Sequence, residues 1–122
     1  MLNLDTHILV ASLAGDLTDR ERTLVANEDL AISDIVLWEL AKVVELGRLV
    51  MDLDSLAFRR SLRHLTIIPI SIQIARRSTR LDFSSDPADE IIAATSVVER
   101  IPLLTRDRKI LKSRIVPFPK QN

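Results

Sequence analysis

Short apolar runs alternate along the chain with segments that carry helical spacing or a helix-start signal. Each run has the length of a buried strand, and its flanking polar residues mark where the strand ends. The expected strands are Leu2–Leu4, Leu30–Ser33, Leu65–Ile70, Ile101–Thr105 and Ile115–Phe118. Strands that alternate with helices are typical of the α/β class. The pattern therefore predicts a central, mainly parallel sheet flanked by helices.

Several helix starts are marked by side chains that can bind free backbone N–H groups. Thr18 and Glu21 have the spacing of a capping box, which predicts a helix over residues 19–27. Asp86 followed by Pro87 predicts a helix that continues to about Glu99. The other expected helices begin after Asp5, cover residues 34–46 with a stop at Gly47, run from Asp54 to Arg63, begin at Ser71, and cover residues 107–112.

The length and composition narrow the class of protein. The 122 residues fit a single domain over residues 1–122, and the 47% hydrophobic content fits one buried core. The chain has no cysteine, which excludes disulfides, thiol nucleophiles and cysteine zinc sites. Its longest stretches without Asp, Glu, Lys or Arg have ten and twelve residues, too short for the roughly 18 of a membrane helix. With no basic segment at the start, we expect a cytoplasmic protein without membrane contact.

The net charge of zero hides two regions of opposite sign. Residues 1–54 contain 11 acidic and 4 basic residues, a net charge of −7. Residues 55–122 contain 6 acidic and 13 basic residues, a net charge of +7. A neutral total therefore does not exclude a nucleic-acid partner.

Four acidic residues are expected at one edge of the predicted sheet. Ligands of a parallel α/β sheet bind at the carboxyl ends of its strands, where helix N-termini also point. Asp5 ends the first strand, Asp107 follows the strand that ends at Thr105, Asp89 lies in the first turn of a helix, and Glu39 lies in the helix after the second strand. All four can reach the same edge.

Clustered carboxylates repel one another and are stable mainly when a hard cation neutralises them. Oxygen ligands without thiol or imidazole partners suit Mg²⁺ or Mn²⁺, and such ions support phosphodiester hydrolysis. Each acid also has a structural interpretation. Asp89 is favourable at the start of any helix, Asp107 can cap the next turn, and Glu39 can pair with Lys42. Asp5 is harder to explain in this way, because a charge within an apolar run is costly to bury.

Other side chains near these acids are candidates for supporting roles. The hydroxyls of Thr6, Ser33 and Thr105 lie at strand ends and can hydrogen-bond the carboxylates. Among the remaining acids, Asp86 is the one most expected to touch the site. Basic residues that can bind RNA phosphates are Arg76, Arg77, Arg80, Arg106 and Arg108. A solvated basic face explains these arginines equally well.

Four segments carry a family resemblance. They are Leu4-Asp5-Thr6-His7, Ser33 through Trp38-Glu39-Leu40, Asp86-Pro87-Ala88-Asp89 running into Ile92-Ala93-Ala94-Thr95, and Leu104-Thr105-Arg106-Asp107. In this order they resemble the signature blocks of PIN-domain ribonucleases, and more narrowly those of VapC toxins from toxin–antitoxin pairs. One departure is Glu90, where an arginine usually follows the third acid.

The resemblance implies a three-layer sandwich around a parallel sheet. It implies that Asp5, Glu39, Asp89 and Asp107 hold one or two Mg²⁺ or Mn²⁺ ions for endonucleolytic RNA cleavage. It also implies a homodimer and a cognate small antitoxin whose tail blocks the site.

Other classes of protein fit the sequence less well. A haloacid-dehalogenase phosphatase needs a second Asp two residues after the first, and that position is His7. A phospho-receiver domain needs an Asp at the end of a middle strand, where this chain has Ser33. A non-catalytic PIN-like module that binds RNA or a partner, and a stand-alone RNA-processing nuclease, remain as alternatives. The complete set of four acids disfavours the non-catalytic module.

Overall fold

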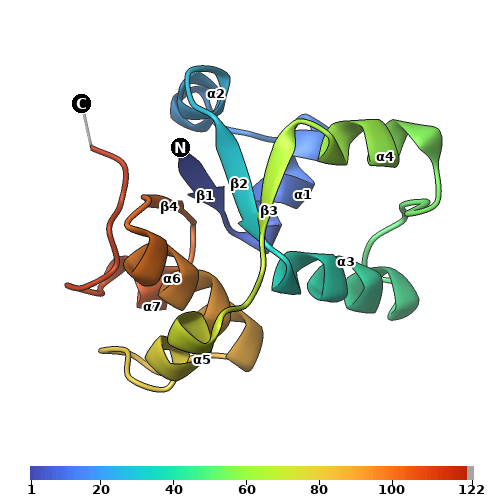
Figure 1. Cartoon of the computed structure of the whole chain (residues 1–122). Coiled ribbons are helices and arrows are strands. Elements are labelled where there is room, and N and C mark those ends of the chain that lie inside the picture. The colour runs from blue at the N-terminus through green and yellow to red at the C-terminus, as the bar shows by residue number, and fades with distance from the viewer. Residues whose placement is uncertain (121–122) are drawn as a thin grey trace.

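The sheet has four strands, all parallel, in the order β3-β2-β1-β4 (Figure 1). This arrangement comes from a computed structural model that describes residues 1–120. The strands are β1 (Leu2–Leu4), β2 (Leu30–Ser33), β3 (Leu65–Ile68) and β4 (Leu103–Leu104). The mainly parallel sheet predicted from the apolar runs is therefore confirmed.

Helices connect these strands. They are α1 (Thr6–Ala14), α2 (Asp19–Ala26), α3 (Ile35–Glu45), α4 (Leu56–Leu62), α5 (Ile72–Ser78), α6 (Pro87–Glu99) and α7 (Arg108–Leu111). The capping box at the start of α2 is present, with the Glu21 backbone N–H donating to Thr18 Oγ1 at 3.2 Å. The start of α4 was predicted wrongly at Asp54, because the Ser55 hydroxyl accepts the Phe58 N–H. Within residues 1–120, the helices are too short to cross a bilayer.

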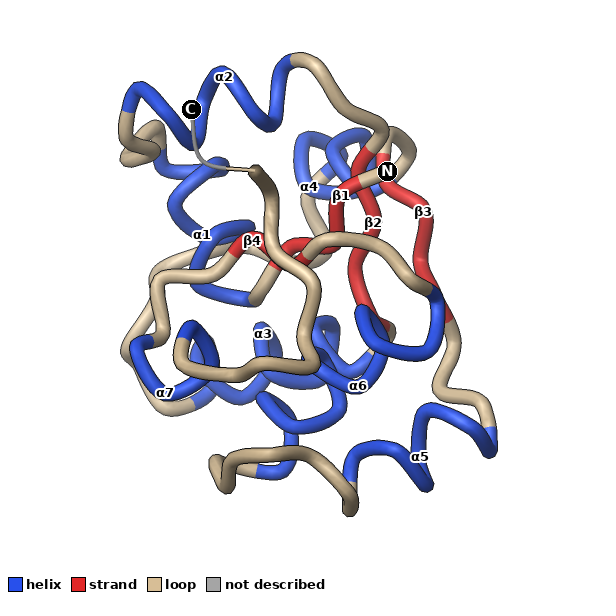
Figure 2. Tube along the Cα trace, turned by 90° about the vertical axis from the view of Figure 1, so that its left-hand side faces the viewer, coloured by secondary structure: helices blue, strands red, loops and turns tan. Residues whose placement is uncertain are grey.

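The strand order places the helices on both faces of the sheet. The chain moves from β1 to β2 to β3 in one direction and then returns past β1 to β4. Because crossovers between parallel strands are right-handed, the return connection packs on the opposite face from the first two. Figure 1 shows α3 on one side of the strands and α5 and α6 together on the other, and Figure 2 shows the same elements turned by 90°. The structure is thus the predicted α/β sandwich of three layers.

The core fills the space between the sheet and the helices. It is built from aliphatic side chains that are at most 2% exposed, including Leu4, Ile32, Leu40, Ile92 and Leu103. Burying each such side chain contributes roughly 1.5 to 3 kcal/mol. This packing fixes α3 and α6 against the sheet and so fixes the ends of these helices at its edge.

The fifth strand predicted over Ile115–Phe118 is wrong. This segment does run beside β4, since the Leu103 N–H donates to the Pro117 carbonyl at 2.9 Å. Pro117 and Pro119 have no N–H to donate, so a regular ladder cannot form. Pro102 similarly limits the start of β4, which is shorter than the predicted Ile101–Thr105 strand.

A buried amide ties the middle of the sheet to α6. Asn3 is fully buried within β1, and its Nδ2 donates to the Ile92 carbonyl at 3.2 Å and to Ser96 Oγ at 2.9 Å. Its Oδ1 is buried without a hydrogen-bond partner among residues 1–120. Because buried polar groups are costly when unpaired, these two bonds hold α6 at one height along the sheet.

We expect Asn3→Ala to lower the free energy of unfolding by about 1 to 3 kcal/mol, because it leaves a small cavity and removes both hydrogen bonds. Urea denaturation measures this change. Asn27→Ala is the matched control, since Asn27 is exposed and also donates Nδ2 to a carbonyl, that of Thr23, at 2.7 Å. Equal losses in the two variants would contradict the assigned role of Asn3.

Candidate active site

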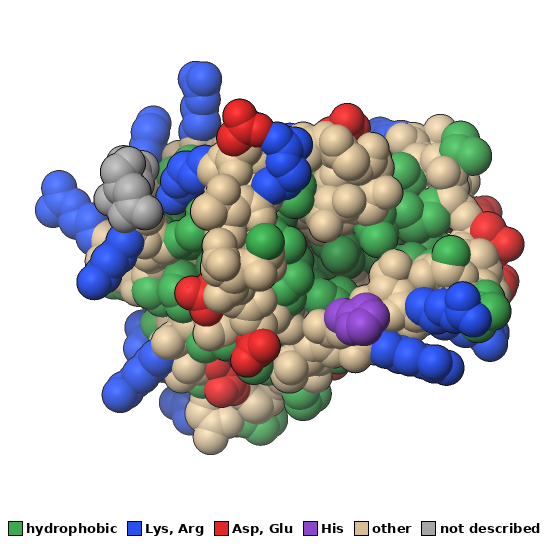
Figure 3. Space-filling view, turned by 90° about the horizontal axis from the view of Figure 1, so that it is seen from above, with side chains coloured by type: hydrophobic (Ala, Val, Ile, Leu, Met, Phe, Trp, Pro, Cys, Tyr) green, Lys and Arg blue, Asp and Glu red, His purple; other side chains and the backbone are tan. Residues whose placement is uncertain are grey.

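The candidate site lies where the strand order reverses. The chain leaves β1 and its neighbour β4 toward opposite faces of the sheet, which opens a crevice at the carboxyl ends of the two strands. A cavity of about 280 Å³ is found there, lined by Asp5, His7, Arg106 and Asp107. The other end of the sheet carries both acidic and basic side chains around its rim (Figure 3). The crevice thus brings two of the predicted acids to one opening.

Asp5 is buried at the start of α1, with an exposed fraction of 2%. Its Oδ1 accepts the Thr6 backbone N–H at 2.7 Å, as the N-cap of the helix. Its Oδ2 accepts the Thr105 hydroxyl at 2.6 Å. The two bonds and the positive end of α1 partly offset the cost of burying this charge.

Glu39 is joined to the same network through a threonine. The hydroxyl of Thr6 donates to Glu39 Oε1 at 2.5 Å, while the backbone N–H of Thr6 binds Asp5. Thr105 has a similar double role, since its hydroxyl donates to Asp5 and accepts the Asp107 N–H at 3.0 Å. Both threonines therefore hydrogen-bond the acids as expected from the sequence.

Asp89 has a raised carboxyl pKa. Burial raises the pKa of its carboxyl from 3.8 to about 6, and three neighbouring carboxylates add to the rise: Asp5, Glu39 and Asp107. The Ser85 hydroxyl, which donates to Asp89 Oδ2 at 3.1 Å, acts in the opposite direction. The repulsion shows that all four predicted acids lie in one neighbourhood. Ser85 was missed by the sequence analysis, although its position four residues before Asp89 places a hydroxyl at the helix start.

Asp107 has the capping role that its sequence context allows. Its Oδ1 accepts the N–H groups of Lys109 at 2.8 Å and Ile110 at 3.2 Å, which begins α7. Both bonds use the same oxygen. Oδ2 has no hydrogen-bond donor among the described residues, so capping leaves it available for a ligand.

The four acids have no basic partner among residues 1–120, where the ion pairs are Met1 with Glu28, Arg22 with Asp19, and Arg106 with Glu21. Neutral hydroxyl and amide donors hold them instead. In the described part of the chain, no group of three or more acidic or histidine side chains is positioned so that it could hold a metal ion together. The site therefore combines an oxygen-only donor set with uncompensated negative charge.

Two predicted supporting residues do not contact the acids. Ser33 is buried, but its Oγ accepts the Ile35 N–H at 3.3 Å, because α3 begins immediately after β2 and leaves this N–H free. Asp86 precedes α6 and is exposed, with no side-chain bond to the helix. Its expected capping role is thus wrong, because the helix begins with Pro87, which has no N–H to be capped. Asp89 is the residue of this helix start that lies near the other acids, and the expected contact of Asp86 with the site stays a prediction.

Arg106, one of the residues predicted to bind RNA, is paired with Glu21. Its Nε and Nη2 donate to the two carboxylate oxygens of Glu21 at 2.9 and 2.6 Å. Arg106 is drawn to Glu21 because the Glu21 side chain is only 8% exposed, where an unpaired charge is costly. These bonds occupy the Nε and Nη2 of the guanidinium.

The remaining predicted arginines are exposed. Arg76 and Arg77 lie on α5 and Arg80 lies just beyond its end, and all three line a groove of about 280 Å³ with Gln73 and Val98. None of the three belongs to an ion pair within residues 1–120. Arg108, the first residue of α7, is also exposed.

Comparisons with known proteins agree with this fold. The chain resembles a chain of a toxin–antitoxin complex from Klebsiella pneumoniae, with a TM-score of 0.74, 24% sequence identity, and coverage of 98% of this chain and 97% of that chain. It also resembles a chain of VapBC2 from Rickettsia felis bound to a promoter DNA fragment, with a TM-score of 0.69, 22% identity and 98% coverage of both chains.

The amino-acid sequence is also similar to that of known proteins. Ribonuclease VapC22 of Mycobacterium tuberculosis is 30% identical over 90 residues, which cover 71% of this chain and 69% of that protein. Residues 3–114 match the PIN domain family, so the match includes most of β1, all of β4 and all four acids of the site. The chain therefore belongs to the PIN domain family.

Proposed function

We propose that the protein is an endoribonuclease that hydrolyses RNA phosphodiester bonds with the aid of Mg²⁺ or Mn²⁺. The observation that carries this proposal is the gathering of Asp5, Glu39, Asp89 and Asp107, without a basic partner in the described chain, at the edge where ligands of such sheets bind. The relationship to Ribonuclease VapC22 supports RNA as the substrate.

The chemistry of the four carboxylates fits a hard divalent cation, and at least three of these side chains would move closer together to hold it. Asp5, Asp89 and Asp107 would hold the ion, and Glu39 would hold it or orient the attacking water. When bound, the ion would supply an activated water and positive charge for the phosphoryl oxygen. Hydrolysis joins the water oxygen to phosphorus, breaks one phosphorus–oxygen bond and passes a proton to the departing oxygen. Ion binding would exchange some local hydrogen bonds, such as that of Ser85 to Asp89, for contacts to the metal.

Thr6 and Thr105 orient the acids for this role. Thr6 hydrogen-bonds Asp5 and Glu39, and Thr105 hydrogen-bonds Asp5 and Asp107. These bonds restrict the rotamers of the Asp5 and Glu39 carboxylates before a ligand binds. The side chains therefore lose their conformational entropy during folding and not when the ligand binds.

The partner of the protein is proposed from its relatives. The solved structures it resembles include toxin–antitoxin complexes. We propose that it is the toxin of a VapBC-type pair, that a cognate small antitoxin binds it, and that it acts on RNA in the cytoplasm. The homodimer implied by the family resemblance stays a prediction.

RNA is proposed to run from the acids toward the groove lined by Arg76, Arg77 and Arg80. Asp89 and Val98 are both on α6, nine residues apart, which is about 14 Å along the helix axis. A single strand of several nucleotides could contact the site and the groove together. Arg108 is proposed as a further phosphate contact beside Asp107.

Replacing Asp5 by Asn tests the proposed chemistry. The amide can still accept the Thr6 N–H, but it lacks the charge that attracts a cation, so we expect RNA cleavage in Mg²⁺ or Mn²⁺ to fall by about 100-fold or more. Asp16→Asn, which changes an exposed acid just beyond α1, is the matched control and is expected to cleave like the parent. A folded Asp5→Asn variant that cuts as well as the parent would rule out this assignment.

Replacing Asp89 by Asn tests the repulsion among the acids. In the folded state the pKa is about 6 and in the unfolded state it is near 3.8, so the folded protein binds the proton more tightly. The stability from this group is present below about pH 4 and is lost as the pH rises through about 6.

In EDTA at pH 7.5 we therefore expect Asp89→Asn to raise the free energy of unfolding by about 1 kcal/mol, after allowing for solvent screening and for the lost helix-end charge. The gain should vanish near pH 4. Asp86→Asn at the same helix start is the control, expected to change stability by less than about 0.5 kcal/mol at both pH values. A loss of stability at both pH values would instead make Asp89 a structural residue.

The RNA path is tested with Arg76, Arg77 and Arg80 all replaced by Gln in the Asp5→Asn background. Each phosphate contact releases counterions, so the affinity for RNA falls as the salt concentration rises. Loss of three contacts should make the negative slope of log affinity against log salt shallower by about 2 for single-stranded RNA. The control replaces Arg59, Arg60 and Arg63 by Gln, an equal charge change at α4. Equal effects of the two triple variants would indicate general charge attraction and contradict this path.

A further inference from the structure

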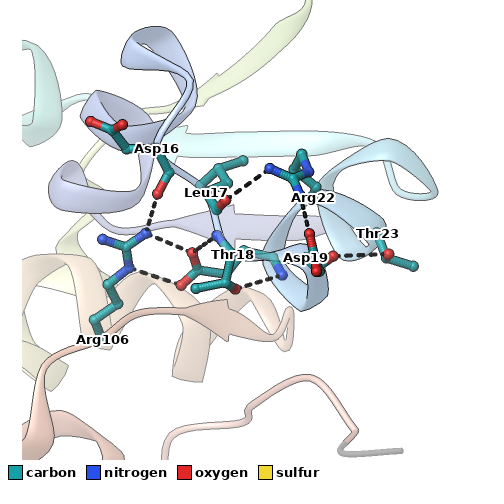
Figure 4. Close-up of polar contacts among 8 residues, drawn as sticks. Asp16, Leu17, Thr18, Asp19, Arg22, Thr23 and Arg106 are labelled. Carbon is teal, nitrogen blue, oxygen red and sulfur yellow. Dashed lines mark hydrogen bonds and ion pairs between the residues drawn. The ribbon is translucent and has the colours of Figure 1, made fainter.

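A bidentate ion pair joins the rim of the acidic cavity to α2. Figure 4 shows the Arg106 guanidinium facing the N-terminal end of α2, where both oxygens of Glu21 accept its N–H groups. The Nη2 also donates to the Asp16 carbonyl at 3.0 Å. Glu21 and Arg106 are 85 residues apart in the sequence.

Glu21 is held rigidly and stays ionised. Its Oε1 accepts the Thr18 backbone N–H at 2.9 Å, and its own N–H donates to the Thr18 hydroxyl. The hydrogen bonds from Arg106 hold the pKa of the Glu21 carboxyl at about 2. Because the anion is fixed by the helix start, it fixes the position of the guanidinium as well.

The position of Arg106 matters because of its neighbours. It lies between Thr105 and Asp107 in the sequence and lines the same cavity as Asp5, His7 and Asp107. A free guanidinium beside carboxylates forms strong paired hydrogen bonds with them. Such pairing here would neutralise the acids that the cation needs.

We propose that Glu21 is a positioning residue, which holds the Arg106 guanidinium at the rim of the acidic cavity and so keeps Asp5 and Asp107 available to a divalent cation. This inference rests on the proposed function, because it requires the four acids to bind such an ion. In this inference the Arg106 guanidinium is held in one place beside the site, whereas the sequence predicted that it contacts RNA.

A merely structural tie makes a different prediction. If the pair only joined α2 to the segment after β4, removing Arg106 as well as Glu21 could not restore the site. If the released positive charge is the cause, removing Arg106 as well does restore it. The double variant therefore separates the two explanations.

The experiment measures Mn²⁺ binding to the RNA-free protein by titration calorimetry. Glu21→Gln retains an oxygen for the capping box but loses the charge that holds Arg106. We expect this variant to bind Mn²⁺ about tenfold more weakly, the scale of one nearby positive charge at a partly solvated site. The Glu21→Gln/Arg106→Gln double variant should return to within about twofold of the parent.

Controls separate this inference from the proposed function. Asp19→Asn removes the exposed pair with Arg22 on the same helix and should bind Mn²⁺ like the parent. Thermal melting gives the folded fraction of each variant at the titration temperature. If the parent protein does not bind Mn²⁺, or if Asp5→Asn binds it equally well, the proposed function and this inference are both overturned.

Unchanged Mn²⁺ affinity in Glu21→Gln would overturn the inference alone, as would a double variant that binds as weakly as Glu21→Gln. Arg106→Gln is an independent arm if Glu21→Gln does not fold. The inference predicts that Arg106→Gln binds Mn²⁺ at least as tightly as the parent, and a tenfold loss there would contradict it.

Discussion

The structure of the site depends on one constraint, which is the burial of the Asp5 carboxylate at the end of β1 among three other acids. A buried charge requires charge-assisted hydrogen bonds or an opposite charge. The chain supplies the first from Thr6 and Thr105, and in the described residues it supplies no basic side chain. The hydrogen bonds of Asp5 are therefore made, but the negative charge of the four acids is not balanced by a basic side chain, which favours the cation of the proposed function.

The parallel topology explains how this constraint is tolerated. Three helices begin near the reversal of strand order, and an acid stands at the start of each: Asp5 for α1, Asp89 for α6 and Asp107 for α7. The positive ends of helices favour such acids. Capping and ligand binding are thus not competing roles. The same helix ends that stabilise the acids in the fold also point them toward the edge where a ligand binds.

The sequence predicted the features whose determinants are local. The ends of β1 and β2, the capping box at Thr18 and the placement of four acids at one edge follow from short patterns, and the structure has them. The pairing of Arg106 with Glu21 could not be predicted, because Glu21 already had a complete local explanation and its partner is 85 residues away. The strand predicted over Ile115–Phe118 failed for the opposite reason, since its apolar pattern was right but its prolines cannot donate to a ladder.

The net charge of zero acquires a physical meaning once the contacts are known. Among the ion pairs of residues 1–120, only Glu21–Arg106 joins the acidic first region to the basic second region. Most of the segregated charge in these residues is therefore not cancelled by ion pairs. Apart from the four acids of the site, 13 acids face 17 bases, a net charge of +4. Unpaired acids in a crevice attract a cation, and unpaired arginines along α5 attract phosphate. A chain that is neutral in total therefore presents two charged surfaces, and their signs match the metal and the RNA backbone that the proposed phosphodiester hydrolysis would bring together.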